Sequence, residues 1–164
     1  MCLRRQPPFW TAADSHSVFL LAAMRPEVDS VDAQWMRTEQ GAGTLRILIV
    51  DDSRHFLDAA RGVLEQGGFA VVGVASTSAE ALKLAAELRP DAILVDIDLG
   101  DESGLDLARA FASSDAAPVV LISAYPESEL RDLLAASPAI GFVSKSELSA
   151  SAISSLLASG RRAN

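Results

Sequence analysis

The sequence predicts an α/β fold with an open, doubly wound, five-stranded parallel sheet. Short apolar runs rich in Ile, Val and Leu alternate with amphipathic stretches from Arg46 onward, which is the pattern of successive βα units. These runs lack polar alternation, so both faces of each strand are expected to be covered by helices. The predicted strands are residues 47–50, 69–75, 92–95, 119–122 and 140–143.

Capping residues and helical spacing predict a helix after each strand. Ser53 can cap a helix that ends at Gly67-Gly68, and Thr77 with Glu80 can form a capping box. The second helix ends before Pro90, which cannot continue it. Further helices are predicted after Ser103, after Pro126 and over residues 146–159. Because right-handed crossovers bring the carboxyl ends of the strands to one edge, ligands are expected there.

Length and composition predict one ordinary domain with an appendage. The chain has 164 residues, of which 49% are hydrophobic and 22% charged, and its formal net charge is −8. This negative charge argues against binding to nucleic acid or an anionic membrane surface, so the expected partner is another protein. The single cysteine, Cys2, excludes an internal disulfide, and such a domain fits the reducing cytoplasm.

We expect three segments along the chain: an N-terminal, poorly ordered extension (1–44), a folded domain (45–160) and a short tail (161–164). The extension contains Pro7-Pro8 and a Gly41-Ala42-Gly43 linker without sustained periodicity. Its longest apolar run, residues 18–24, is too short to span a bilayer. The residues after Ser159 are too few for an output domain, so output is expected to pass through a partner or through dimerisation.

Polar side chains follow four of the predicted strands. Asp51-Asp52 follow the first strand, Asp96 the third, Ser123 the fourth and Lys145 the fifth. Neighbouring carboxylates repel one another unless a cation neutralises them, and Mg²⁺ prefers such oxygen ligands. Each residue alone has a simpler interpretation; Asp52, for example, could only cap the following helix. The combination at one edge of the sheet favours a functional site.

This set of residues is suited to phosphoryl transfer onto a carboxylate. The reaction needs a nucleophile, a metal that bridges phosphoryl oxygens, and donors for the remaining oxygens. Asp96 can attack, Asp51 and Asp52 can hold Mg²⁺, and Ser123 and Lys145 can donate to the phosphoryl oxygens. The chain has only two lysines, Lys83 and Lys145. Because lysines are so few, the placement of one directly after the last strand favours a functional role for it.

Residues 46–159 resemble the receiver domain of bacterial two-component response regulators. The resemblance is carried by Ile47–Ser53, by Ile93–Leu99 with Gly104, by Leu121–Ala124 and by Phe142–Lys145. It implies a flavodoxin-like fold with strand order 2-1-3-4-5. It also implies a Mg²⁺-dependent phosphorelay protein, phosphorylated on Asp96 by a sensor histidine kinase or phosphotransfer protein. Such a protein catalyses its own phosphorylation and dephosphorylation, but is classed as a signalling protein rather than an enzyme.

The resemblance assigns two further roles. Asp98 is implied to give its backbone carbonyl to Mg²⁺, alongside the Asp51, Asp52 and Asp96 carboxylates. Ser123 and Phe142 are implied to form a switch that remodels the face made by the fourth helix, fifth strand and fifth helix. That face would serve a downstream protein partner or a homodimer.

Three positions depart from the common family pattern. Gly100 stands where many relatives carry proline, which predicts a more mobile loop after Asp96. Ser146 follows Lys145 where a cis-proline is common, which leaves open how Lys145 is held. Phe142 replaces the more common tyrosine and lacks its hydroxyl.

Three alternative functions can be weighed against the pattern. A pseudo-receiver would bind partners without phosphorylation, but the complete set of site residues argues against it. A haloacid-dehalogenase-type phosphatase uses an Asp-x-Asp motif like Asp96-Ile97-Asp98, but on its first strand, and here the acidic pair comes first. A flavodoxin-like cofactor protein would need a phosphate loop where Asp51-Asp52 would repel phosphate.

Overall fold

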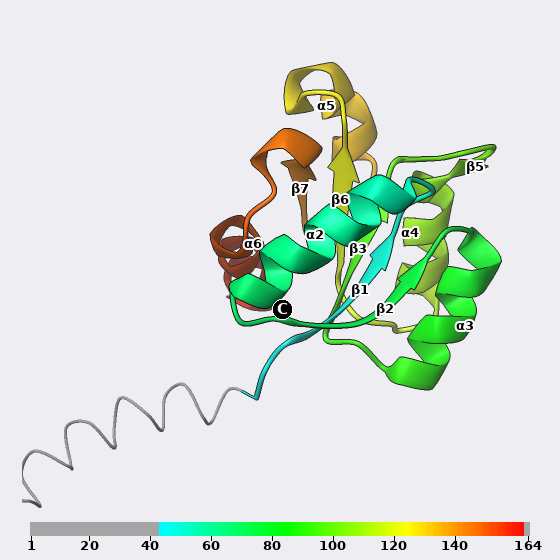
Figure 1. The fold of residues 1–164 in the computed structure, drawn as a ribbon. Coiled ribbons are helices and arrows are strands. Elements are labelled where there is room, and N and C mark those ends of the chain that lie inside the picture. Colours follow the sequence, from blue (N-terminus) through cyan, green and yellow to red (C-terminus); the bar gives the residue numbers. More distant parts are fainter. Residues whose placement is uncertain (1–42, 163–164) are drawn as a thin grey trace, which may run out of the picture. The chain divides into compact units, whose positions relative to one another are not determined.

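Five parallel strands form the central sheet of the computed structural model, which describes residues 43–162 (Figure 1). The spatial order is β2-β1-β3-β6-β7. Because the short strands β4 and β5 form a separate sheet, β6 and β7 are the fourth and fifth strands of the central sheet, which confirms the predicted order 2-1-3-4-5. The strands are β1 (Arg46–Val50), β2 (Ala70–Ala75), β3 (Ala92–Asp96), β6 (Val119–Ser123) and β7 (Gly141–Ser144). The predicted extension lies outside the described residues, apart from its last two. Among the helices within 43–162, none has the length and apolar character needed to cross a membrane.

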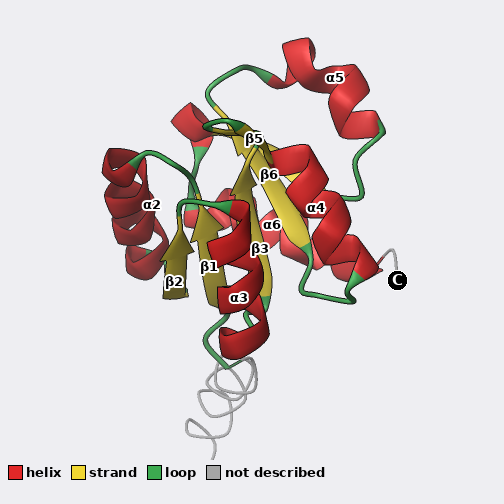
Figure 2. Ribbon diagram, turned by 90° about the vertical axis from the view of Figure 1, so that its right-hand side faces the viewer, coloured by secondary structure: helices red, strands yellow, loops and turns green. Residues whose placement is uncertain are grey.

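Helices cover both faces of the sheet, as the doubly wound prediction requires (Figures 1 and 2). α2 (Arg54–Gln66) and α6 (Ala150–Arg162) pack with one apolar cluster. α3 (Ser78–Leu88), α4 (Gly104–Ser113) and α5 (Glu127–Ala135) contribute to the cluster on the opposite face. The carboxyl edge of the sheet, where ligands are expected, therefore lies between two helical layers.

Alternate residues of each strand belong to opposite clusters. In β1, Ile47 and Ile49 face α2 and α6, whereas Leu48 and Val50 face the other layer. All four are fully buried. Since successive strand residues point to opposite faces, burial on both faces explains why the sequence shows uninterrupted apolar runs.

The predicted helix caps are largely confirmed. Ser53 Oγ accepts a hydrogen bond from Phe56 N, and Thr77 Oγ1 accepts one from Glu80 N at 3.2 Å. Glu80 does not complete the expected capping box, because its carboxylate accepts from Ser76 N, at 2.9 Å, instead of from the Thr77 amide. The first helix ends before Gly67, as predicted.

The prediction of one continuous last helix over residues 146–159 was wrong. A 3₁₀ helix, η1 (Lys145–Glu147), follows β7, and α6 begins only at Ala150. Between them Leu148 adopts an extended conformation with ψ 120°. Ser149 Oγ then accepts from Ala152 N at 3.1 Å, so a serine hydroxyl satisfies an amide at the new helix start.

The loop after Asp96 contains a short hairpin that the sequence pattern did not predict. β4 (Asp98–Leu99) pairs antiparallel with β5 (Glu102–Ser103). Gly100 at the turn has φ +62°, a conformation that glycine adopts at little cost. Glu102 accepts a hydrogen bond from Ser78 N at 2.6 Å, which lowers the pKa of the Glu102 carboxyl and ties the hairpin to the start of α3.

Gly104 provides a direct test of how tightly this loop packs. A Cβ atom there would overlap the backbone carbonyl of Asp96. We expect Gly104→Ala to lower the free energy of unfolding by about 1–3 kcal/mol, because the loop after Asp96 would have to move. Chemical denaturation measures this effect. Gly62→Ala in α2 is the matched control, since its Cβ would meet no atom within 4 Å, and we expect it to be stabilising. Equal effects of the two substitutions would contradict this packing.

Candidate functional site

Acidic and basic side chains meet at the carboxyl edge of the sheet. Asp51 follows β1, Asp96 ends β3 and Lys145 follows β7. The two aspartates are 0% and 3% exposed, which is unusual because ionisable groups are seldom buried unless paired. The strand order places β1 and β3 side by side, while the long Lys145 side chain reaches across from the far edge.

The Lys145 ammonium lies between the two buried carboxylates. Its Nζ is 2.6 Å from Asp51 Oδ2 and 2.9 Å from Asp96 Oδ2. The contact with Asp96 is a hydrogen bond. The contact with Asp51 is short but lacks hydrogen-bond geometry, and Asp51 Oδ2 has no hydrogen-bond partner among residues 43–162. One ammonium therefore only partly satisfies two buried carboxylates.

Burial and charge alter the protonation of both partners. Burial is the main reason that the pKa of Asp96 rises from 3.8 to about 6, with the negative charge of Asp51 adding to it and the hydrogen bond from Lys145 opposing it. Burial acts to lower the pKa of Lys145, but its close contacts with the negatively charged Asp51 and Asp96 carboxylates outweigh burial, and this pKa is raised. Lys145 therefore stays positively charged at neutral pH.

The raised pKa of Asp96 predicts a pH-dependent effect on stability. Ionisation of the Asp96 carboxyl is less favourable in the folded chain than in the unfolded chain. The stability that the protonated carboxyl contributes is therefore fully present below pH about 4 and is lost as the pH rises through about 6. Without divalent metal, Asp96→Asn should therefore gain stability relative to the unsubstituted protein between about pH 4 and pH 7. Denaturation of both proteins across this range measures the difference. A pH-independent difference would contradict the raised pKa.

The acidic cluster is suited to a divalent cation. Asp51, Asp52 and Asp96 each offer a carboxylate oxygen, and these three oxygens lie within 4.8 Å of one another. The buried Asp51 Oδ2 accepts no hydrogen bond from the described residues and already faces the Lys145 ammonium, so its surroundings suit a cation. An all-oxygen donor set with one exposed member is typical of Mg²⁺ sites, where the ion keeps several waters.

A cleft of about 390 Å³ opens over this cluster. Its walls include the predicted site residues Asp52, Asp96, Asp98 and Lys145. Gly100, Ala124 and Tyr125 also line it. Sequence reasoning assigned no site role to Tyr125, which is 53% exposed. Its position two residues after Ser123, in a loop at the carboxyl edge, was the available signal.

Asp98 and Ser123 lie next to the acidic cluster rather than within it. The Asp98 amide donates to Asp96 Oδ1 at 3.3 Å, and its side chain is exposed. Ser123 is fully buried at the end of β6, and its hydroxyl accepts from Tyr125 N at 3.2 Å. Phe142 is half-buried in β7 and packs against the cluster that contains α3, α4 and α5.

Sequence reasoning also missed one aromatic neighbour of the site. The Lys145 Nζ lies over the ring of Phe56, 4.5 Å from its centroid. The Phe56 side chain also packs against the apolar cluster beneath α2. Its location in the first turn after Asp51-Asp52 was the only sequence signal for proximity to the site.

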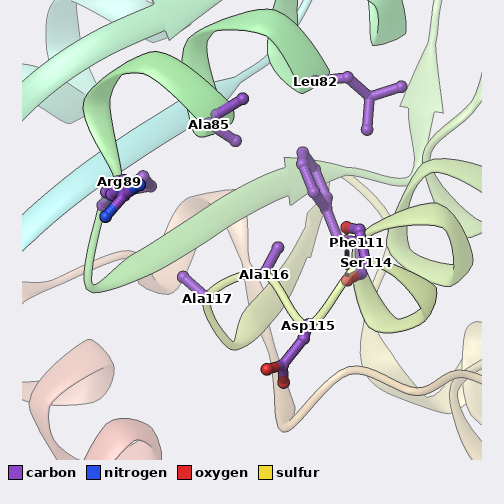
Figure 3. Close-up of a pocket in the computed structure, with 10 residues that line it drawn as sticks. Leu82, Ala85, Arg89, Phe111, Ser114, Asp115, Ala116 and Ala117 are labelled. Atoms are coloured by element: carbon purple, nitrogen blue, oxygen red, sulfur yellow. Dashed lines mark hydrogen bonds between the residues drawn. The ribbon is translucent and has the colours of Figure 1, made fainter.

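A larger cavity, of about 470 Å³, lies at the opposite edge of the sheet. Figure 3 shows Leu82 and Ala85 of α3 on one side and the segment Ser114–Ala117 on the other, with Phe111 between them. It contains none of the predicted site residues. The predicted site residues instead line the smaller cleft over the acidic cluster.

Comparison with known proteins gives a family match over most of the chain. Residues 47–156 match the family model described as the response regulator receiver domain. The chain is 42% identical over 104 residues to protein-glutamate methylesterase/protein-glutamine glutaminase 5 of Myxococcus xanthus, covering 62% of this chain and 30% of that protein. It is 39% identical over 82 residues to the transcriptional regulatory protein KdpE of Mycobacterium tuberculosis, covering 50% and 36%. This chain thus spans about a third of each relative.

Solved structures agree with the family match. The signal receiver domain of the putative response regulator NarL from Mycobacterium tuberculosis superposes with a TM-score of 0.63 at 28% identity, covering 70% of this chain and 97% of that one. A CheY-like receiver domain protein from Methanospirillum hungatei shares the fold, with a TM-score of 0.61, 24% identity, and coverage of 74% and 100%. These matches confirm the predicted flavodoxin-like architecture and favour the receiver over the phosphatase alternative. The chain belongs to the response regulator receiver domain family of two-component signalling.

Proposed function

We propose that this protein accepts a phosphoryl group on Asp96 and transmits a signal through the resulting change in its surface. One observation supports this proposal most directly. At the carboxyl edge of the sheet, beneath an open cleft, Lys145 Nζ lies 2.6 Å from the Asp51 carboxylate and 2.9 Å from the Asp96 carboxylate. A buried carboxylate beside one ammonium and further acidic ligands is suited to covalent phosphoryl transfer.

Asp96 acts as the nucleophile in this proposal. One of its carboxylate oxygens attacks phosphorus, and the bond between phosphorus and the donor breaks. The donor keeps the electron pair: a histidine nitrogen of a sensor kinase or phosphotransfer protein, or the acetate of acetyl phosphate. Hydrolysis reverses the modification when a water oxygen attacks phosphorus and the Asp96 carboxylate leaves as inorganic phosphate forms. The chain's own residues take part in catalysing both the transfer and the hydrolysis.

Asp51, Asp52 and Asp96 would hold Mg²⁺, and the Asp98 backbone carbonyl would supply a further ligand. When bound, the ion neutralises phosphoryl oxygens and relieves the repulsion among the carboxylates. Lys145 would pair with one phosphoryl oxygen. The Ser123 hydroxyl would turn from the Tyr125 amide to donate to another.

Output would pass through the face formed by α5, β7 and α6. A shallow cleft of about 350 Å³ on this face is lined by Phe142, Glu127 and Leu156, among others. Withdrawal of Ser123 toward the phosphoryl group would let the Phe142 ring turn inward and reshape this cleft. A downstream protein or a second copy of the chain would read the change. We further propose a cytoplasmic location, with residues 45–160 as the receiver between an N-terminal extension and a short tail.

The test is phosphoryl uptake by the purified full-length protein. We expect acetyl phosphate to add one phosphoryl group to the intact mass, and beryllofluoride to shift the amide NMR signals near Ser123 and Phe142, both only with Mg²⁺. No adduct and no shift would indicate a pseudo-receiver. Rapid steady release of phosphate from phosphate esters would indicate a phosphatase.

A further inference from the structure

We propose that Phe56 is a positioning residue that holds the Lys145 ammonium at the phosphoryl site through a cation–π contact. The inference deepens the proposed function and rests on it. Lys145 approaches the site from a chain segment that leaves β7 and enters the 3₁₀ helix η1. Ser146 occupies the next position, so no proline ring fixes the backbone directly after Lys145.

The ammonium has three neighbours. Two are the carboxylates of Asp51 and Asp96, at 2.6 and 2.9 Å, and the third is the Phe56 ring, at 4.5 Å from its centroid. The Lys145 side chain is only 19% exposed, so water screens these contacts weakly. An ammonium within about 6 Å of an aromatic centroid is attracted by the negative face of the ring, more strongly when desolvated.

A closed set of contacts fixes the ring relative to the site. Asp51 Oδ1 accepts from Ser53 N at 2.8 Å, and Ser53 Oγ accepts from Phe56 N at 3.4 Å. The Phe56 ring then faces Lys145, whose Nζ returns to Asp51 Oδ2. The ring also packs against the apolar cluster beneath α2. Phe56 is therefore held by the same helix cap that follows the acidic pair.

The ring becomes more important when the carboxylates are engaged elsewhere. Asp51 and Asp96 attract Lys145 in the metal-free chain, but both are candidate Mg²⁺ ligands and Asp96 is the nucleophile. Once a divalent cation neutralises them, their attraction for Lys145 falls. The Phe56 ring carries no competing charge and remains in contact, so it keeps the ammonium near the incoming phosphoryl oxygens.

The first measurement is the NMR signal of the Lys145 side chain. Protons over the face of an aromatic ring resonate upfield, so the Lys145 ε protons should lie upfield of those of Lys83, which is exposed and is the other lysine of the chain. Phe56→Leu should remove the difference and Phe56→Tyr should keep it, with and without Mg²⁺. An upfield shift that is absent, or that survives in Phe56→Leu, would overturn the proposed contact.

The second measurement is the rate of phosphoryl uptake from acetyl phosphate at saturating Mg²⁺. We expect Phe56→Leu to lower the maximal rate about three- to tenfold while the Mg²⁺ affinity stays unchanged, and Phe56→Tyr to recover most of the loss. Val63→Ala, at an exposed apolar position on the same helix, controls for helix stability. Equal losses in the Leu and Tyr variants would overturn the positioning role.

The two proposals can fail separately. Phosphoryl uptake by the unsubstituted protein with no upfield Lys145 signal would overturn the role of Phe56 and leave the proposed function standing. An upfield signal in a protein that takes up no phosphoryl group would overturn the proposed function, and with it the role of Phe56 in the reaction.

Discussion

Asp96→Asn is expected to abolish Mg²⁺-dependent phosphoryl uptake, lowering the rate by at least about a thousandfold, or about 4 kcal/mol of barrier. The reason is chemical, because a neutral amide is a far poorer nucleophile than a carboxylate. The substitution preserves the size of the side chain and removes one of two buried negative charges beside Lys145. We therefore expect the variant to fold.

Intact-mass measurement after incubation with acetyl phosphate would quantify the loss. Asp101→Asn is the matched control, because it removes one negative charge from the exposed turn that follows Asp96 and lies outside the acidic cluster. We expect it to react at nearly the original rate. Undiminished uptake by Asp96→Asn would mean that another group, such as Asp52, accepts the phosphoryl group.

Asp52→Asn is expected to weaken Mg²⁺ binding by about tenfold or more, which corresponds to at least about 1.4 kcal/mol. Asp52 supplies one of three clustered carboxylate oxygens and is the exposed member of the cluster. Lys145 already offsets part of the charge of Asp51 and Asp96. The Asp52 carboxylate forms no salt bridge within the described part of the chain, so it should contribute strongly to cation attraction.

A Mg²⁺ titration followed by amide NMR measures this affinity directly. Asp101→Asn again serves as the control for a simple reduction in net charge. Similar Mg²⁺ affinities for the Asp52 variant and the unsubstituted protein would exclude Asp52 as a ligand. A loss that is equal in the two variants would point to the general negative potential of this edge rather than to coordination.

Local patterns predicted the elements well where the periodicity was strong. The apolar runs of β1 and β3 are buried on both faces, and the Ser53 and Thr77 caps accept the expected backbone hydrogen bonds. The prediction failed at the end of the chain, where the helical spacing of residues 146–159 hid the break at Leu148. Periodicity does not reveal a break when the residues on both sides of it fit a helix.

The site could be predicted in outline because parallel strands end at one edge. Asp51, Asp52, Asp96 and Lys145 were all expected there, and all line the cleft or the acidic cluster. The 3.2 Å contact between Ser123 and the Tyr125 amide was not predictable. It depends on the conformation of one loop, which the sequence specifies only through its packing.

The sequence by itself determined the fold class and the identity of the candidate site residues, because these follow from local periodicity and from where strands end. The strand order was implied by the family resemblance alone. Only the tertiary structure decided that Lys145 reaches Asp96, 49 residues earlier in the chain, and that the ring of Phe56 faces the same ammonium. Such contacts depend on how the helical layers pack against the sheet. A local sequence pattern does not specify the distance between side chains that lie far apart in the chain.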